Sequence, residues 1–465
     1  MTRPNILWLM TDEQRPDSIG CYGSAWAQTP NLDRLAAGGT RFDTAIVPSP
    51  VCIPSRTSIL AAAYPHTTGT WTNEHNKQHQ THLLTPFHEA GYRSASFGKQ
   101  HYDLAANAFQ EQGGVSEGNQ AVGCLDYREP YHGDDFEQVQ YPGPVKWILG
   151  GRYPEDAASR CEYQVVDRCI AWLQEHDDDT PFLLRASFAG PHTPVVPPEP
   201  FDRLVQDDDI DLPPADECRF PEACPWWIEE KLAATHAAAA LDADQIRRMR
   251  RHYYGNVAFL DQQFGRLLTW MEQRGLLQNT IIAFCSDHGT CLGDHGLVQK
   301  ESFFDQVVDV GFILTPPPGM DAPRGQALKT PVSVMSLLPT LLELCDLDVP
   351  AGAEAPSLAA AVRAGAEPEA RPVLSEISLG GPRLFFQRNG IEQPEIDRER
   401  SHHVMVRDGK WKLVFTVAGA PAEPALFDLA ADPGEEHNLA GQPEHQPVVD
   451  RLTAVWQEAA GSRQN

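Results

Sequence analysis

Apolar positions alternate along the chain between short continuous runs and longer stretches with helical spacing. Three continuous runs are typical of parallel strands buried on both faces, and they lie at 5–10, 181–190 and 280–287. A shorter strand is predicted to end at Phe97. Helical spacing predicts helices at 31–38, 82–90, 157–176 and 243–274. Strands alternating with helices predict an α/β fold, with a doubly wound, mostly parallel sheet flanked by helices.

The second half of the chain changes character after Gly352, where Ala, Glu and Pro dominate and predict a linker. Beyond it, alternating residues around Asp408 and Gly409 predict a β-hairpin, and helical spacing predicts a closing helix at 447–460. We therefore expect a large α/β domain over 1–370 and a small C-terminal subdomain over 371–465. This subdomain is an antiparallel sheet plus a helix, packed on the first domain.

Two stretches, 105–155 and 200–245, are rich in Gly, Pro and acidic residues and show no clear period. They are expected to be irregular insertions that line a substrate pocket. The chain has no internal repeat, and its sequence leaves the oligomeric state open.

The composition of the 465 residues, 42% apolar and 22% charged, is ordinary for a globular protein. The net charge of −27 argues against a nucleic-acid partner and against adhesion to anionic membranes. No apolar run reaches the length of a membrane span, and the first run is too short for a secretion signal. The ten cysteines include no C-x-x-C pair, so we expect free thiols and a cytoplasmic location.

The segment from Pro50 to Gly69 carries the most specific local pattern, because Cys52, Pro54 and Arg56 precede a helical run at 57–63. Proline is tolerated in the first helical turn, so Cys52 is expected at or just before a helix N-terminus. The N–H groups and dipole there favour an anion, and Arg56 adds donors suited to a tetrahedral oxyanion. The pattern predicts a nucleophile in an anion site. In isolation it fits a buried cysteine at an ordinary helix start equally well.

Four predicted loops carry further polar residues, and each loop follows the carboxyl end of a strand. The loops begin after Met10, Phe97, Ala189 and Ser286. Ligands of doubly wound sheets bind beyond these strand ends, so we expect the loops to meet. Carboxylates from separate loops repel one another unless a cation lies between them. The metal-ligand candidates are Asp12, Glu13, Asp287 and His288. Oxygen ligands with one imidazole predict Ca²⁺, Mg²⁺ or Mn²⁺.

The basic candidates could surround one oxyanion together with Arg56. They are Lys99, His101, His192 and Lys300. Taken singly, each of these residues is more often a solvated charge or a satisfied histidine. Asn73 is a further candidate, a neutral donor to a bound substrate.

In their order along the chain, these elements resemble the formylglycine-dependent sulfatases of the alkaline phosphatase superfamily. The resemblance covers residues 4–439. It rests on TDEQRPDSIGCYG, CIPSR, GKQH, PHTP, SDHG, Lys300 and the tail GKWKLVF…ALFDLAADPGEEHNLAG. It implies that a modification enzyme oxidises Cys52 to formylglycine, which Arg56 stabilises. It further implies one divalent metal, Ca²⁺ first, bound by residue 52 with Asp12, Asp287 and His288. Glu13 stands where the family has a second aspartate.

The implied reaction is hydrolysis of a small-molecule or carbohydrate sulfate ester. One hydroxyl of the hydrated formylglycine attacks sulfur, and His192 or Lys300 protonates the leaving group. The second hydroxyl, deprotonated by His101, then expels sulfate, while Lys99 helps to bind the sulfate group.

Two alternatives remain open. The pair Asp287-His288 also resembles the choline-sulfatase and phosphonate-monoester-hydrolase branches, so the chain could hydrolyse a phosphonate monoester or phosphodiester with the same nucleophile. An alternative of another class is a non-catalytic binding protein that retains the fold.

Overall fold

The computed structural model describes most of the chain. The described residues are 3–73, 81–104, 108–114, 139–140, 148–176, 179–206, 210–212, 241–379, 401–419 and 423–461. At its centre lies an eight-stranded sheet in the order β13-β2-β12-β9-β1-β8-β4-β5. The strands in chain order are β1 (Asn5–Asp12), β2 (Thr40–Phe42), β4 (Arg93–Gly98), β5 (Glu111–Gly113), β8 (Phe182–Pro191), β9 (Thr280–Ser286), β12 (Phe312–Thr315) and β13 (Gln326–Leu328).

The sheet is mostly parallel, as predicted. Strand β1 pairs in parallel with both β8 and β9, and β4 extends the parallel set. Only β12 runs antiparallel to its two neighbours among the described strands of this sheet.

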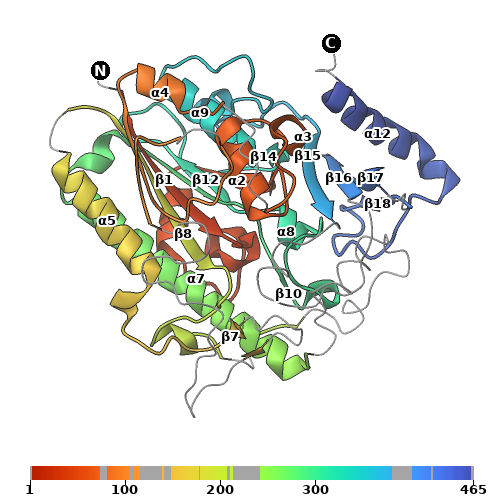
Figure 1. Cartoon of the computed structure of the whole chain (residues 1–465), viewed down its shortest axis with the longest axis horizontal. Helices are drawn as coiled ribbons and strands as arrows, with labels where there is room; N and C mark the ends of the chain where they lie inside the picture. The colour runs from red at the N-terminus through yellow and green to blue at the C-terminus, as the bar shows by residue number, and fades with distance from the viewer. Residues whose placement is uncertain are drawn as a thin grey trace.

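Helices cover both faces of this sheet (Figure 1). On one face, Leu7 and Leu9 of β1 pack in a core shared with α1 (Pro30–Ala37), α5 (Cys161–Glu175) and α7 (Ala243–Glu272). On the other face, Ile6, Trp8 and Met10 pack with α2 (Cys52–Ala61) and α9 (Leu337–Leu344). Burial on both faces explains why this strand is a continuous apolar run.

A second, four-stranded antiparallel sheet lies near the C-terminus in the order β15-β16-β17-β18. Its strands are β15 (Val373–Leu379), β16 (Ser401–Asp408), β17 (Trp411–Ala418) and β18 (Ala425–Asp428). The predicted hairpin is present, because β16 pairs with β17 and Gly409 adopts φ 58° between them. Helix α12 (Gln446–Gly461) lies over this sheet at the outer edge of the molecule (Figure 1).

This C-terminal sheet is covered on both faces. Val404 and Leu413 pack against Trp456 of α12, whereas Met405 and Val414 point into the core that also holds Ile6 of the central sheet. The sheet therefore packs on the main body as expected, and the domain boundary at residue 370 stays a prediction.

Several elements differ from the prediction. The stretch after Gly352 is more than a linker, because α10 (Ala359–Ala364) buries Val362 in the main core. The strand β5 lies within the stretch predicted to be irregular and forms an edge of the central sheet. A second short strand there, β7 (Ile148–Gly150), pairs with residues 139–140. The rest of 105–155 and 200–245 lies largely outside the described residues.

The cysteines also correct one expectation. Cys52, Cys169 and Cys285 carry free thiols, but Cys161 is disulfide-bonded. The prediction of free thiols is wrong for Cys161, because spacing along the sequence does not reveal which cysteines become neighbours in the fold. None of the described helices combines the length and hydrophobicity that crossing a bilayer requires.

Candidate active site

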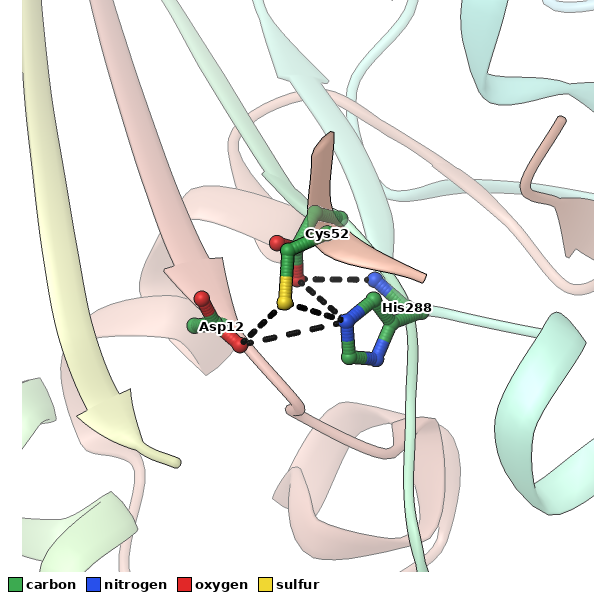
Figure 2. Close-up of side chains that lie close together, drawn as sticks. Asp12, Cys52 and His288 are labelled. Carbon is green, nitrogen blue, oxygen red and sulfur yellow. Dashed lines mark hydrogen bonds and ion pairs between the residues drawn. The ribbon is translucent and has the colours of Figure 1, made fainter. Parts of the chain in front are cut away.

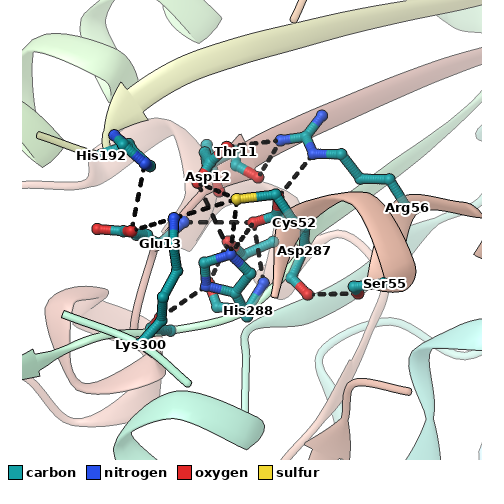
Figure 3. A network of polar contacts seen from close by, with 12 residues as sticks. Thr11, Asp12, Glu13, Cys52, Ser55, Arg56, His192, Asp287, His288 and Lys300 are labelled. Carbon is teal, nitrogen blue, oxygen red and sulfur yellow. Dashed lines mark hydrogen bonds and ion pairs between the residues drawn. The ribbon is translucent and has the colours of Figure 1, made fainter. Parts of the chain in front are cut away.

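The carboxyl ends of four parallel strands bring the candidate residues together, as the topology predicted (Figure 3). Asp12 is the last residue of β1, and Lys99 follows β4. His192 follows β8, and the pair Asp287-His288 follows β9. Cys52 enters this group as the first residue of α2, with Pro54 in the first turn. Segments far apart in sequence therefore share one buried site.

The thiol of Cys52 lies at the centre of the site and is 1% exposed. Its Sγ lies 3.1 Å from Lys300 Nζ, 3.2 Å from His288 Nε2 and 3.7 Å from Lys99 Nζ. Burial and Asp12 raise the pKa of Cys52, but these three cationic groups outweigh them and bring it to about 5. The position therefore favours a negative charge, as expected at a helix N-terminus.

Four potential metal ligands face one another at this point. Asp12, Cys52, Asp287 and His288 each offer one donor atom, and all four atoms lie within 4.8 Å of one another. Figure 2 shows Cys52 Sγ facing Asp12 and the His288 ring. His288 Nδ1 lies 2.8 Å from the Gly289 carbonyl, to which it can donate, and this directs Nε2 toward the other ligands. Two buried carboxylates with one imidazole fit a divalent metal ion.

Arg56 joins the two carboxylates of this set. Its side chain is 0% exposed, with Nε donating to Asp287 Oδ2 at 2.6 Å and Nη2 to Asp12 Oδ2 at 3.3 Å. Burial raises the pKa of Asp12, but Lys99 and Arg56 lower it well below its usual value. Burial raises the pKa of Asp287 more than Arg56 lowers it. The sequence predicted that Arg56 stabilises the nucleophile, and this role stays a prediction; the direct polar partners of Arg56 here include the carboxylates of Asp12 and Asp287.

Glu13 does not belong to the group of four potential ligands, but it lies in a second group with Asp12 and His192. Its Oε1 is 2.6 Å from Lys300 Nζ and 3.5 Å from His192 Nε2. The backbone of Glu13 adopts a left-handed φ of 63°, and its carbonyl accepts a 2.6 Å hydrogen bond from Tyr253. The geometry groups Glu13 with Asp12 and His192, so its predicted role as a ligand beside Asp287 and His288 stays a prediction.

The four basic candidates also gather here. Lys99 Nζ pairs with Asp12. Lys300 is flanked by Gln299 and Glu301, with left-handed φ values of 71° and 72° that are rare outside glycine and mark functional sites.

Their charges differ in a way that bears on proton transfer. Burial lowers the pKa of His192 to about 3, with help from Lys300, and burial and Lys99 lower that of His101 well below its usual value. Burial lowers the pKa of Lys300, but Cys52 and Glu13 outweigh it and raise the pKa well above its usual value. Lys300 is thus protonated, whereas the imidazoles of His192 and His101 are neutral.

Three further residues support the site, of which Ser55 lies in the CIPSR motif without an assigned role and the other two carry no recognisable sequence signal. Ser55 Oγ donates to the Asp287 carbonyl at 2.6 Å, and Ser187 Oγ accepts from Arg56 Nη1 at 2.9 Å. The hydroxyl of Tyr253 binds Glu13 as described above. Asn73 lies beside the site, where its Oδ1 caps α2 by accepting the Ile53 N–H at 3.0 Å. Its predicted contact with substrate stays a prediction.

Comparison with known proteins gives a consistent result. The family model described as Sulfatase matches residues 4–347. The Ulvan-active sulfatase of Formosa agariphila is 28% identical and aligns over 97% of this chain and 80% of its own length.

Two solved structures share the fold at 21% identity. One is a protein in complex with its substrate D-glucosamine-2-N,6-O-disulfate, with a TM-score of 0.79 and 99% of each chain covered. The other is the phosphonate monoester hydrolase of Agrobacterium radiobacter, with a TM-score of 0.82, covering 98% of this chain and 96% of that one.

Proposed function

The chain belongs to the sulfatase family, and on that premise we propose that it hydrolyses a sulfate ester with the residue formed from Cys52 as nucleophile. The observation that carries the proposal is the convergence on Cys52 of two lysines, Lys99 and Lys300, and three potential metal ligands. A decayed, non-catalytic relative would be expected to lack part of this set.

The proposal includes a bound metal ion and a modified residue 52. Asp12, Asp287 and His288 would hold a divalent metal together with residue 52, and a modification enzyme would convert Cys52 to formylglycine. When present, the metal supplies positive charge against sulfate oxygens, and the hydrated aldehyde supplies one hydroxyl to form an ester and another to release it. Ca²⁺ is the first candidate metal, with Mg²⁺ and Mn²⁺ as alternatives.

The chain's own side chains bind the anion and move protons. Lys99 and Lys300 lie close enough to Cys52 Sγ to bind oxygens of a sulfate group centred near it. Lys300 Nζ is the proposed proton donor to the leaving oxygen, because it lies 3.1 Å from Cys52 Sγ and therefore within reach of an ester bound at residue 52. The neutral His101 is the proposed base that accepts a proton from residue 52.

A sulfated carbohydrate is the proposed substrate class. It is supported by the ulvan-active relative and by the fold shared with a protein solved with a sulfated glucosamine. Location is a separate matter. The cytoplasmic location stays a prediction, although a disulfide such as that of Cys161 persists mainly in oxidising compartments.

The function is tested with two measurements. The mass of the peptide that contains Cys52 reports conversion to formylglycine. Turnover of 4-nitrophenyl sulfate is compared with that of a 4-nitrophenyl phosphonate ester, because the phosphonate monoester hydrolase shares the fold. We expect the sulfate ester to be preferred. A preference for the phosphonate would establish the alternative, and no turnover of either ester by converted, metal-loaded protein would overturn the proposal.

A further inference from the structure

The C-terminal tail carries two buried charges for which the chemistry above provides no role. Lys412 lies in the GKWKLVF motif on β17 and is 0% exposed. Glu435 lies in the DPGEEHNLAG motif beyond β18 and is 1% exposed. Charged side chains are almost never buried this completely unless they are paired. Their partners therefore indicate what the tail does.

Both residues hold Asp305, which belongs to the main body of the protein. Lys412 Nζ lies 2.6 Å from Glu435 Oε1 and 2.7 Å from Asp305 Oδ1. Glu435 Oε2 accepts a 2.8 Å hydrogen bond from the backbone N–H of Asp305. Arg407 of β16 adds a contact of 3.3 Å to Asp305 Oδ2. The side chain and backbone of Asp305 are thus both fixed from the C-terminal tail, in a cluster of two cations (Lys412 and Arg407) and two anions (Glu435 and Asp305 itself).

Asp305 is the first residue of α8 (Asp305–Val308), which lies on the side of the main body that faces the C-terminal sheet (Figure 1). The segment that leads to it begins at Lys300. Near its start, the Glu301 N–H donates to the Pro50 carbonyl at 3.2 Å, just ahead of Cys52. Near its end, Phe304 stacks on His295 with ring centres 3.7 Å apart. The segment that carries Lys300 is therefore anchored at one end beside the nucleophile and at the other by the C-terminal sheet.

This anchoring matters because both neighbours of Lys300, Gln299 and Glu301, have an unfavourable left-handed backbone conformation. The left-handed residues on either side of it persist only where surrounding contacts determine them. A buried ion cluster adds little net stability over apolar residues of similar volume, but it does fix geometry. The tail cluster thus supplies the kind of constraint that the Lys300 segment requires.

We propose that Lys412, Glu435 and Asp305 are positioning residues that hold Lys300 Nζ at the leaving-group oxygen, so that the C-terminal sheet is part of the catalytic unit. The proposal rests on the proposed function for its kinetic consequence only. Its structural consequence, an ordered 299–305 segment, does not depend on the reaction.

The test uses the full-length protein and a charge-balanced variant. Lys412→Met combined with Glu435→Gln removes one positive and one negative charge together, which avoids leaving an unpaired charge in the interior. Lys410→Met is the matched control, because Lys410 is half exposed, lies on the same hairpin and pairs with Asp428 rather than with Asp305. Lys412→Arg keeps the charge and is expected to retain wild-type behaviour. Circular dichroism and thermal unfolding confirm that each variant is folded.

The first measurement is amide hydrogen exchange in residues 299–305. We expect exchange there to accelerate about tenfold or more in the double variant and to be unchanged in Lys410→Met. If the double variant does not fold, Glu435→Gln alone is measured in the same way, because it removes the negative charge that pairs with Lys412 and that accepts the Asp305 N–H. Unchanged exchange in the folded variant overturns the proposal, whether or not the protein proves to be a sulfatase.

The second measurement is kcat/KM for a series of aryl sulfates with leaving groups of increasing pKa. A misplaced proton donor slows the reaction most for poor leaving groups, which depend on protonation. We therefore expect kcat/KM to fall about tenfold or more with phenyl sulfate and to change little with 4-nitrophenyl sulfate. Lys300→Ala should steepen the dependence in the same way, and adding it to the double variant should cause little further loss. If the wild type prefers phosphonates, the same series is run with aryl phosphonates. A loss that is equal for all leaving groups overturns the positioning role.

Discussion

Replacing Arg56 with methionine tests the electrostatic design of the site, because Arg56 lies between two carboxylates that a metal would also neutralise. The side chains of Arg56, Asp12 and Asp287 are all 0% exposed. Asp12 retains Lys99 as a partner after the substitution, whereas Asp287 loses its 2.6 Å contact with Arg56. Removing one partner of a buried pair costs about 3–5 kcal/mol, since the remaining charge is left without compensation.

This free energy can be converted into a shift of the melting temperature. Unfolding entropy is about 2.1 cal/mol/K per residue, which for 465 residues gives about 1 kcal/mol/K. We therefore expect metal-free Arg56→Met to melt about 3–5 °C below metal-free wild type. A divalent ion at Asp12 and Asp287 replaces part of the lost positive charge, so Ca²⁺ should stabilise the variant more than the wild type.

The assay is differential scanning calorimetry of both proteins in EDTA and in excess Ca²⁺. Arg371→Met is the control, because the Arg371–Glu369 pair is 57% and 74% exposed, and such a pair contributes only about 0–1 kcal/mol. Two results would refute the reasoning. One is an Arg56→Met protein that melts with the wild type in EDTA, and the other is an equal gain from Ca²⁺ in both proteins.

Four further predictions concern the chemistry and the tail. Cys52→Ser should form a sulfate ester once and retain it, whereas Cys52→Ala should form no ester. Single-turnover kinetics with mass spectrometry distinguishes the two variants. Rapid multiple turnovers by the serine variant would contradict release of sulfate by the second hydroxyl of the hydrated formylglycine. Asp12→Ala or Asp287→Ala should abolish turnover while circular dichroism stays native, because both residues lie at the end of the sheet rather than in its core; near-wild-type activity in EDTA would refute the metal assignment. Glu13→Gln should lower kcat less than Asp12→Ala does, since Glu13 pairs with Lys300 and is not one of the four potential metal ligands. Equal losses of kcat would indicate that Glu13 binds the metal directly. A 1–370 fragment should be inactive, and an active fragment released by limited proteolysis would contradict the role of the C-terminal sheet.

Sequence reasoning succeeded for the fold where burial leaves a strong periodic signal. The strands β1, β8 and β9 are 7–10 residues long and buried almost throughout, so their apolar runs were unambiguous. The strands β2 and β13 contain only three residues each, which is too short to show a period. Such strands form because neighbouring strands offer hydrogen-bonding partners, as β12 does for β2, and this information is absent from the local sequence.

The sequence predicted which residues gather at the candidate site, but it predicted less well which of them contact one another. Motifs at the ends of strands identified residues that do converge, because topology brings the carboxyl ends of parallel strands to one edge. The partners of each residue depend on contacts over long separations. Arg56 and Asp287, for example, are 231 residues apart in the chain. Asn73 likewise caps α2 through Ile53, a contact that its position in a loop did not reveal.

The charges of the site explain how so acidic a protein could bind an anionic ester. Three carboxylates, those of Asp12, Glu13 and Asp287, balance the fixed cations Arg56, Lys99 and Lys300. Local neutrality alone would not attract an anion toward a protein of net charge −27. A divalent ion at the potential ligands would make the site positive over a few ångströms, while surface charges farther away than about 8–10 Å are screened by physiological salt. The acidic surface and an anionic substrate are therefore compatible on the proposed function, in which the metal, rather than the lysines alone, would give the site its net attraction.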